Sequence, residues 1–169
     1  LFWEDGKVDI GKNEDNVLEI AHYARSKNMK SALTIMPSVI LGDNFKLKDI
    51  NSYDAIAVDV YPSIIVSTYT NGCKYNENLY TNLLYCSQKK LRDMGYTGQV
   101  WYVYQAFGIN GEDPKTLIEK FKLQKETINS AKDIGIEGLI PFGYYISQGA
   151  LESEPVLYQG YGSVIDEYV

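Results

Sequence analysis

Apolar positions follow two different periods along this chain, and the alternation between them predicts strands separated by helices. Short apolar runs predict strands over 30–37, 54–61, 99–106 and 137–143, with a further strand end at 1–3. Apolar residues at helical spacing predict helices over 14–28, 77–94 and 113–135, a short helix within 44–52 and a weaker one over 155–168. Because β and α units alternate, we expect an α/β fold with a mainly parallel sheet and right-handed crossovers.

Three of the predicted strands end in polar or aromatic clusters. The run after Ala55 carries Asp59 and Tyr61, the run after Val100 carries Trp101 and Gln105, and the third ends in Tyr144 and Tyr145. Parallel strands bring their carboxyl ends to one rim, which is where α/β folds bind ligands. We therefore expect Asp59 and Gln105 to face one cavity at that rim.

The two faces of the strand over 54–61 differ in character. One face carries Ala55, Ala57, Asp59 and Tyr61, and the other carries Ile56, Val58 and Val60. Small and polar residues suit the interior of a (β/α)₈ barrel, while the β-branched residues would meet the helices. A complete barrel typically needs about 250 residues. The 169 residues therefore predict a single α/β domain, residues 1–169, that is part of a (β/α)₈ barrel. A complete open sheet is the alternative.

Composition and charge narrow the possible partners. Hydrophobic residues make up 45% of the chain and charged residues 22%, which is typical of a globular protein. The net charge of −6 and the absence of a basic block argue against nucleic acid and anionic membranes as partners. No run approaches the roughly 20 apolar residues that span a bilayer. Nucleotide-binding glycine motifs are absent too, so we expect no cofactor and assign no metal ligand.

The two cysteines allow two interpretations. Cys86 falls in a helical pattern with Leu79 and Leu83, which predicts a buried thiol. The alternative is a disulfide with Cys73, which would imply an oxidising compartment. The chain also starts with Leu1 rather than Met, which fits a processed product or a fragment whose upstream part supplies the other half of the barrel.

Aromatic residues with polar tips are frequent, with 15 tyrosines and two tryptophans. Such rings stack on the C–H faces of sugars and also form hydrogen bonds with sugar hydroxyls. Gln105 can both donate and accept, as recognition of hydroxyl groups requires. A carboxylate such as Asp59 inside an apolar strand is costly unless it is paired or hydrogen-bonded, which marks it as a structural or functional group. These features point to a carbohydrate ligand.

The same segments resemble the C-terminal half of a glycoside-hydrolase-type (β/α)₈ barrel. Phe2-Trp3-Glu4-Asp5 resembles the end of the fourth strand, and strands five to eight would be 34–37, 58–61, 101–105 and 139–145. The resemblance implies acid-assisted cleavage of a glycosidic bond, with Glu4 or Asp5 as the acid and Asp59 as the second carboxylate. The residues around the sugar would be Trp3, Tyr61, Trp101, Gln105, Tyr144 and Tyr145.

One position departs from the pattern of many retaining barrel glycosidases. The strand that resembles the seventh ends in Gln105, where those enzymes place a nucleophilic carboxylate. Some barrel glycosidases instead cluster carboxylates near the fourth strand and use a Tyr from the sixth in substrate-assisted chemistry, and Glu4, Asp5, Asp59 and Tyr61 are compatible with that arrangement.

Other interpretations remain open. Asp5-Gly6 is also a turn dipeptide, so the acid pair can be read as a solvated turn. A non-catalytic barrel that binds carbohydrate would keep the aromatic rim without the chemistry. For the catalytic barrel and for the non-catalytic one, we expect a secreted or extracytoplasmic protein.

Overall fold

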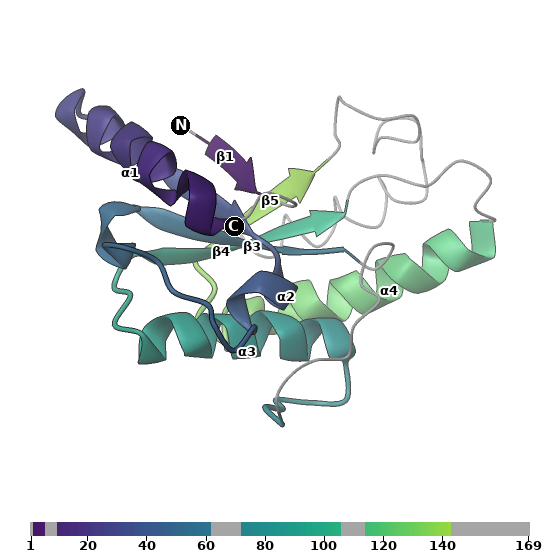
Figure 1. Ribbon diagram of the computed structural model, residues 1–169. Helices are drawn as coiled ribbons and strands as arrows, with labels where there is room; N and C mark the ends of the chain where they lie inside the picture. The colour runs from purple at the N-terminus through teal and green to yellow at the C-terminus, as the bar shows by residue number, and fades with distance from the viewer. Residues whose placement is uncertain (1, 6–9, 62–71, 106–113, 143–169) are drawn as a thin grey trace.

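The computed structural model describes residues 2–5, 10–61, 72–105 and 114–142, and it confirms an α/β fold built on a parallel sheet (Figure 1). Within these ranges the sheet has five strands in chain order, and every neighbouring pair is parallel. The strands are β1 (Phe2–Asp5), β2 (Ala32–Ile35), β3 (Ala55–Val60), β4 (Gln99–Gln105) and β5 (Gly138–Phe142). Residues 2 and 3 of the expected strand end are therefore part of a paired strand.

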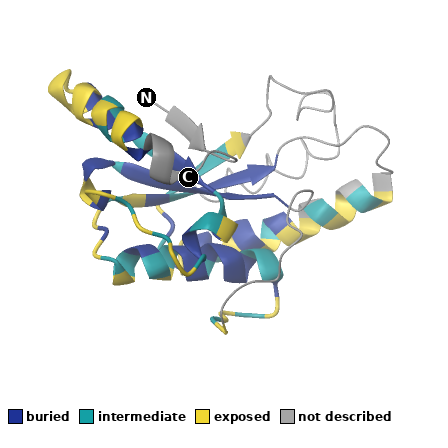
Figure 2. Cartoon of the chain, in the orientation of Figure 1, coloured by how far each residue is buried: buried dark blue, intermediate teal, exposed yellow. Residues whose placement is uncertain are grey.

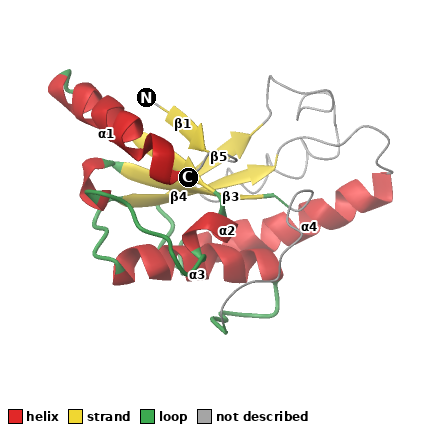
Figure 3. Ribbon diagram, in the orientation of Figure 1, coloured by secondary structure: helices red, strands yellow, loops and turns green. Residues whose placement is uncertain are grey.

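The long helices overlap their predicted ranges (Figure 3). The helical segments are α1 (Ile10–Ser26), α2 (Pro37–Ile40), α3 (Leu79–Asp93), α4 (Pro114–Ala131) and a 3₁₀ turn, η1 (Ile50–Ser52). The short helix expected within 44–52 is present as the 3₁₀ turn η1, which occupies only the last three residues of that range. Pro37 ends the preceding extended segment, as expected, but it also begins α2 because its fixed φ suits the first helical position. The helix predicted over 155–168 lies outside the described residues.

The described helices pack on one face of the sheet. In β3, Ile56, Val58 and Val60 enter the main core, as the alternation predicts. Side chains from α1, α2, α3 and α4 complete the same core, among them Val17, Ala21, Ile40, Leu83, Leu84, Leu91, Ile128 and Ala131. Figure 2 shows the resulting pattern, in which β3 and most of β4 are buried, β5 is intermediate to exposed, and the helices are exposed on their outer sides.

The opposite face of the sheet carries a smaller cluster. It consists of Ala57, Tyr61 and Val103, with Trp101 and Ile140 packed against it. No helix among the described residues contributes to this second cluster. Right-handed crossovers that always advance the sheet in one direction place their helices on one side, whereas doubly wound sheets reverse direction at a switch point. This arrangement is compatible with consecutive βα units of a barrel. We call the face with the smaller cluster the helix-free face.

Candidate functional site at the carboxyl end of the sheet

Asp59 and Tyr61 lie at the carboxyl end of β3 on the helix-free face. Their neighbours at even positions enter the helix-facing core, and Ala57 and Tyr61 belong to the opposite cluster. Asp59 pairs in register with Val103, another member of that cluster. Asp59 is 4% exposed and Tyr61 is 3% exposed. The strand therefore places a carboxylate and a phenol side by side in a region that excludes most water.

Gln105 ends the neighbouring strand, β4. Trp101, Val103 and Gln105 stand at every second position of β4 and therefore share one face of the sheet, the face that also carries Asp59. Gln105 is 2% exposed. The structure thus puts Asp59 and Gln105 on one face at the carboxyl end of the strands, and the expectation that they face one cavity stays a prediction. The segments 62–71 and 106–113, which follow these two strands, lie outside the described residues.

Gln124 holds the end of β4 in place. This residue of α4 is 1% exposed; its Oε1 accepts a hydrogen bond from the Gln105 backbone N–H at 2.7 Å, and its Nε2 donates to the Gln105 carbonyl at 3.2 Å. Sequence reasoning missed Gln124, although it stands in the apolar stripe formed by Leu117, Phe121, Ile128 and Ala131. A polar residue at such a position is the signal that could have found it.

The register of β1 separates the two candidate acids. Glu4 pairs with Thr34, in a row that continues through Ala57 and Trp101 to Gly138. Asp5 instead pairs with Ile35, in a row that continues through Val58 of the helix-facing core. The register position of Glu4 thus belongs to the helix-free face, and that of Asp5 does not. Trp3, which pairs with Leu33, shares the helix-facing rows.

Thr34 adds a polar group to the row of Glu4. Its residue is 2% exposed, and its Oγ1 has no hydrogen-bond partner within the part of the chain that the structure describes. A buried hydroxyl without a partner costs free energy, so such groups often mark sites where water or a ligand completes the bonding. Thr34 was not among the residues singled out from the sequence.

A disulfide fastens the segment that leads into α3. Cys73 and Cys86 are bonded, with 6.0 Å between their Cα atoms. The alternative of a disulfide with Cys73 is therefore confirmed, and the expectation of a free thiol at Cys86 was wrong. In addition, Asn82 accepts hydrogen bonds from the backbone N–H groups of Tyr75 and Asn76 at 2.8 and 2.9 Å. The helical spacing of Cys86 could not reveal the bridge, because the partner lies in a segment without periodic structure.

Trp101 lies nearer the amino end of β4 than Gln105 does. It is four residues before Gln105, which corresponds to about 13 Å along a strand. It lines a pocket at the opposite end of the sheet, where the amino ends of the strands meet. Trp101 also packs against the cluster on the helix-free face that contains Tyr61 and Val103, and it shares the row of Ala57, two residues below Asp59. Tyr144 and Tyr145 lie outside the described residues.

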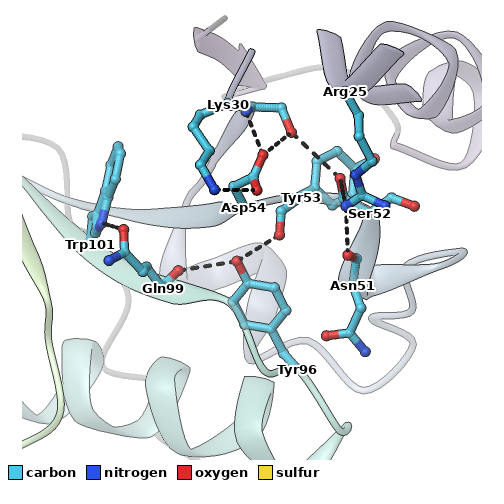
Figure 4. A network of polar contacts seen from close by, with 10 residues as sticks. Arg25, Lys30, Asn51, Ser52, Tyr53, Asp54, Tyr96, Gln99 and Trp101 are labelled. Atoms are coloured by element: carbon cyan, nitrogen blue, oxygen red, sulfur yellow. Dashed lines mark hydrogen bonds and ion pairs between the residues drawn. The ribbon is translucent and has the colours of Figure 1, made fainter. Parts of the chain in front are cut away.

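A polar network surrounds the amino ends of the strands (Figure 4). The buried Tyr96 hydroxyl donates to the carbonyls of Tyr53 and Gln99, at 3.2 and 3.1 Å, and burial raises the pKa of this phenol well above its usual value. Beside it, Asp54 accepts a hydrogen bond from the Ser31 backbone N–H at 2.9 Å. Because Tyr96 stays protonated, it remains a hydrogen-bond donor across the physiological pH range.

Asp54 provides a pH-dependent contribution to stability. The backbone N–H of Ser31, and then Lys30, hold the pKa of this carboxyl below its usual value of 3.8. A carboxyl with a lowered folded pKa stabilises the native state above the unfolded pKa, and that contribution is lost as the pH falls through the folded pKa. We expect Asp54→Asn to lower the free energy of unfolding at pH 7, and the difference from wild type to vanish in strong acid.

Urea unfolding of the two proteins across this pH range measures the effect. The exposed carboxyl of Asp93 provides a control, since Asp93→Asn removes a charge from a surface ion pair at the end of α3. A difference between Asp54→Asn and wild type that stays constant from neutral to acid pH would contradict the assignment.

Metal and membrane sites are not apparent in the described residues. Within the described ranges, no group of three or more His, Cys, Asp or Glu side chains is arranged to hold a metal ion. Among the helices of the described chain, none has both the length and the apolar character needed to cross a bilayer. Comparison of the sequence with protein-family models and with curated proteins finds no match.

Proposed function

We propose that this chain is part of a (β/α)₈ barrel that binds a carbohydrate at the carboxyl ends of its strands and cleaves a glycosidic bond with acid assistance. One observation carries the proposal. A carboxylate, a phenol and an amide, from Asp59, Tyr61 and Gln105, are buried together on the helix-free face at the end of parallel strands. In barrels, this end of the sheet holds the site.

The β1 register supports Glu4, rather than Asp5, as the acid. Glu4 is two strands away from Asp59 and two residues lower along the sheet. Strand spacing and rise place their Cα atoms about 12 Å apart, a distance from which two carboxyl groups reach the roughly 6.5–9.5 Å of inverting glycosidases. Glu4 would protonate the leaving oxygen, and Asp59 would activate a water molecule on the other side of the sugar.

The disulfide supports the cellular location that goes with this proposal. Bridges such as Cys73–Cys86 form and persist in oxidising compartments. We therefore propose that the protein is secreted or extracytoplasmic, where polysaccharide substrates are abundant.

A screen for binding and cleavage tests the proposal. The natural full-length protein is incubated with aryl glycosides and sugar polymers, and products are measured together with affinity. Gln105→Ala is expected to weaken binding by about 1–3 kcal/mol, because hydroxyl groups of the ligand lose their partner. Gln88→Ala on α3 is the matched control, and thermal unfolding reports whether each variant is folded.

The outcomes separate the alternatives. Cleavage that depends on Gln105 supports the proposal. Binding without cleavage of any substrate would favour a non-catalytic carbohydrate-binding barrel. The absence of both binding and cleavage would refute the proposal.

A further inference from the structure

A pocket of about 510 Å³ lies at the amino ends of the strands, on the opposite rim of the sheet from Asp59 and Gln105. Its size is within the range of small-molecule sites. Its principal side chains are Lys30, Asp54, Gln99, Trp101 and Glu137. We propose that this pocket binds an uncharged saccharide ring, with the indole of Trp101 as the stacking surface.

The indole of Trp101 is held in position before any ligand arrives. Its Nε1 donates a hydrogen bond to Gln99 Oε1 at 3.1 Å. Gly138 lies directly against the ring: a Cβ at that position would be 2.6 Å from Trp101 Cδ1 and 2.9 Å from Cγ. Only glycine leaves room for the indole in this orientation. A stacking surface that is already ordered loses little entropy when a ligand binds.

The charges around the pocket are balanced within the protein. Lys30 Nζ pairs with Asp54 at 3.3 Å, and Arg92 pairs with Glu137 at 3.2 Å. The Glu137 carboxylate also accepts a hydrogen bond from the Val100 backbone N–H at 2.9 Å. A ligand with a negative charge would meet two carboxylates, and a ligand with a positive charge would have to displace Lys30 or Arg92. The pocket therefore favours an uncharged ligand.

The arrangement of polar groups matches a polyhydroxylated ring. Figure 4 shows Trp101 and Gln99 on one side and Lys30 with Asp54 on the other. An ammonium group and an amide can donate hydrogen bonds, and carboxylate oxygens can accept them. A saccharide ring combines apolar C–H faces, which suit the indole, with hydroxyl groups at its edge, which suit these partners. This inference rests on the pocket alone and does not require catalysis at the carboxyl end.

Nuclear magnetic resonance of the indole N–H groups tests the inference. The chain has two tryptophans, so Trp101→Phe identifies the resonance of Trp101. The probes are the methyl glycosides of glucose, galactose and mannose, with galacturonate and glucosamine as charged counterparts. We expect the Trp101 resonance to shift with at least one neutral glycoside, with a Kd on the order of 1 mM, and to shift less with the charged sugars.

Variants locate the binding site. Gln99→Ala and Gly138→Ala are each expected to weaken binding by about tenfold, the first by releasing the indole and the second by displacing it. Gln99 is exposed, so its variant keeps the test valid if Gly138→Ala does not fold. Tyr23→Ala, which alters an exposed tyrosine on α1, is expected to leave the affinity unchanged.

Three results would overturn the inference. The first is the absence of a shift with every neutral glycoside up to about 50 mM, well above the expected Kd. The second is tighter binding of a charged sugar than of its neutral counterpart. The third is a Gln99→Ala variant that keeps the affinity of the wild type, because the sugar would then not depend on the indole that Gln99 holds in position.

Discussion

Glu4→Gln is expected to lower the rate of glycosidic cleavage by roughly 10²–10⁴-fold, while Asp5→Asn leaves it almost unchanged. An amide cannot give up the proton that the leaving oxygen needs. The contrast follows from the register of β1, which assigns Glu4 to the row of Thr34 and Ala57 and assigns Asp5 to a helix-facing row. The measurement is kcat and KM for both variants on the substrate that the wild type cleaves.

Asp59→Asn completes this comparison. If Asp59 activates the water molecule, its amide variant is also expected to lose kcat while it retains substrate affinity. If Glu4→Gln and Asp5→Asn both leave kcat unchanged, β1 does not supply the acid. A loss at Asp5 alone would contradict the assignment by register, and circular dichroism of each variant excludes misfolding as the cause.

Removal of the disulfide is expected to lower the free energy of unfolding by about 3 kcal/mol, because the bridge closes a loop of 13 residues in the unfolded chain. The double variant Cys73→Ala/Cys86→Ala avoids a single reactive thiol and does not bury a hydroxyl at position 86. Urea unfolding with and without a reducing agent measures the effect.

The same experiment contains its control. Reduction is expected to destabilise the wild type to about the level of the double variant and to leave the double variant unaffected. Equal unfolding midpoints for the oxidised wild type and the double variant would show that the bridge does not contribute to stability.

The strand positions and the two faces of β3 could be predicted from the sequence, because burial on alternate sides leaves a period of two in the residues. The choice between Glu4 and Asp5 could not, since they are adjacent and only the pairing of β1 with β2 distinguishes their rows. The same limit applies to Trp101. Its strand was predicted correctly. The position of Trp101 near the amino end of that strand, which places it at the amino-end pocket, was not considered.

The amino-end pocket was missed for a different reason. Its charged side chains come from three separate connections, at Lys30, Asp54 and Glu137, and each of these residues stands just before a strand. No local motif joins them, because only the parallel alignment of the strands brings them together. A charged residue immediately before each of several apolar runs is a weak signal, but it is one that sequence analysis can use.

Gln124 has a consequence for how α4 is aligned with the sheet. The hydrophobic effect is not directional, so burial alone distinguishes less sharply than hydrogen bonds do between positions of a helix that differ by one turn, about 5.4 Å. The two hydrogen bonds from Gln124 to the backbone of Gln105 have direction and fixed length, and they form in one alignment only. The Gln124 amide therefore favours one position and one rotation of α4 over others that would bury a similar apolar area.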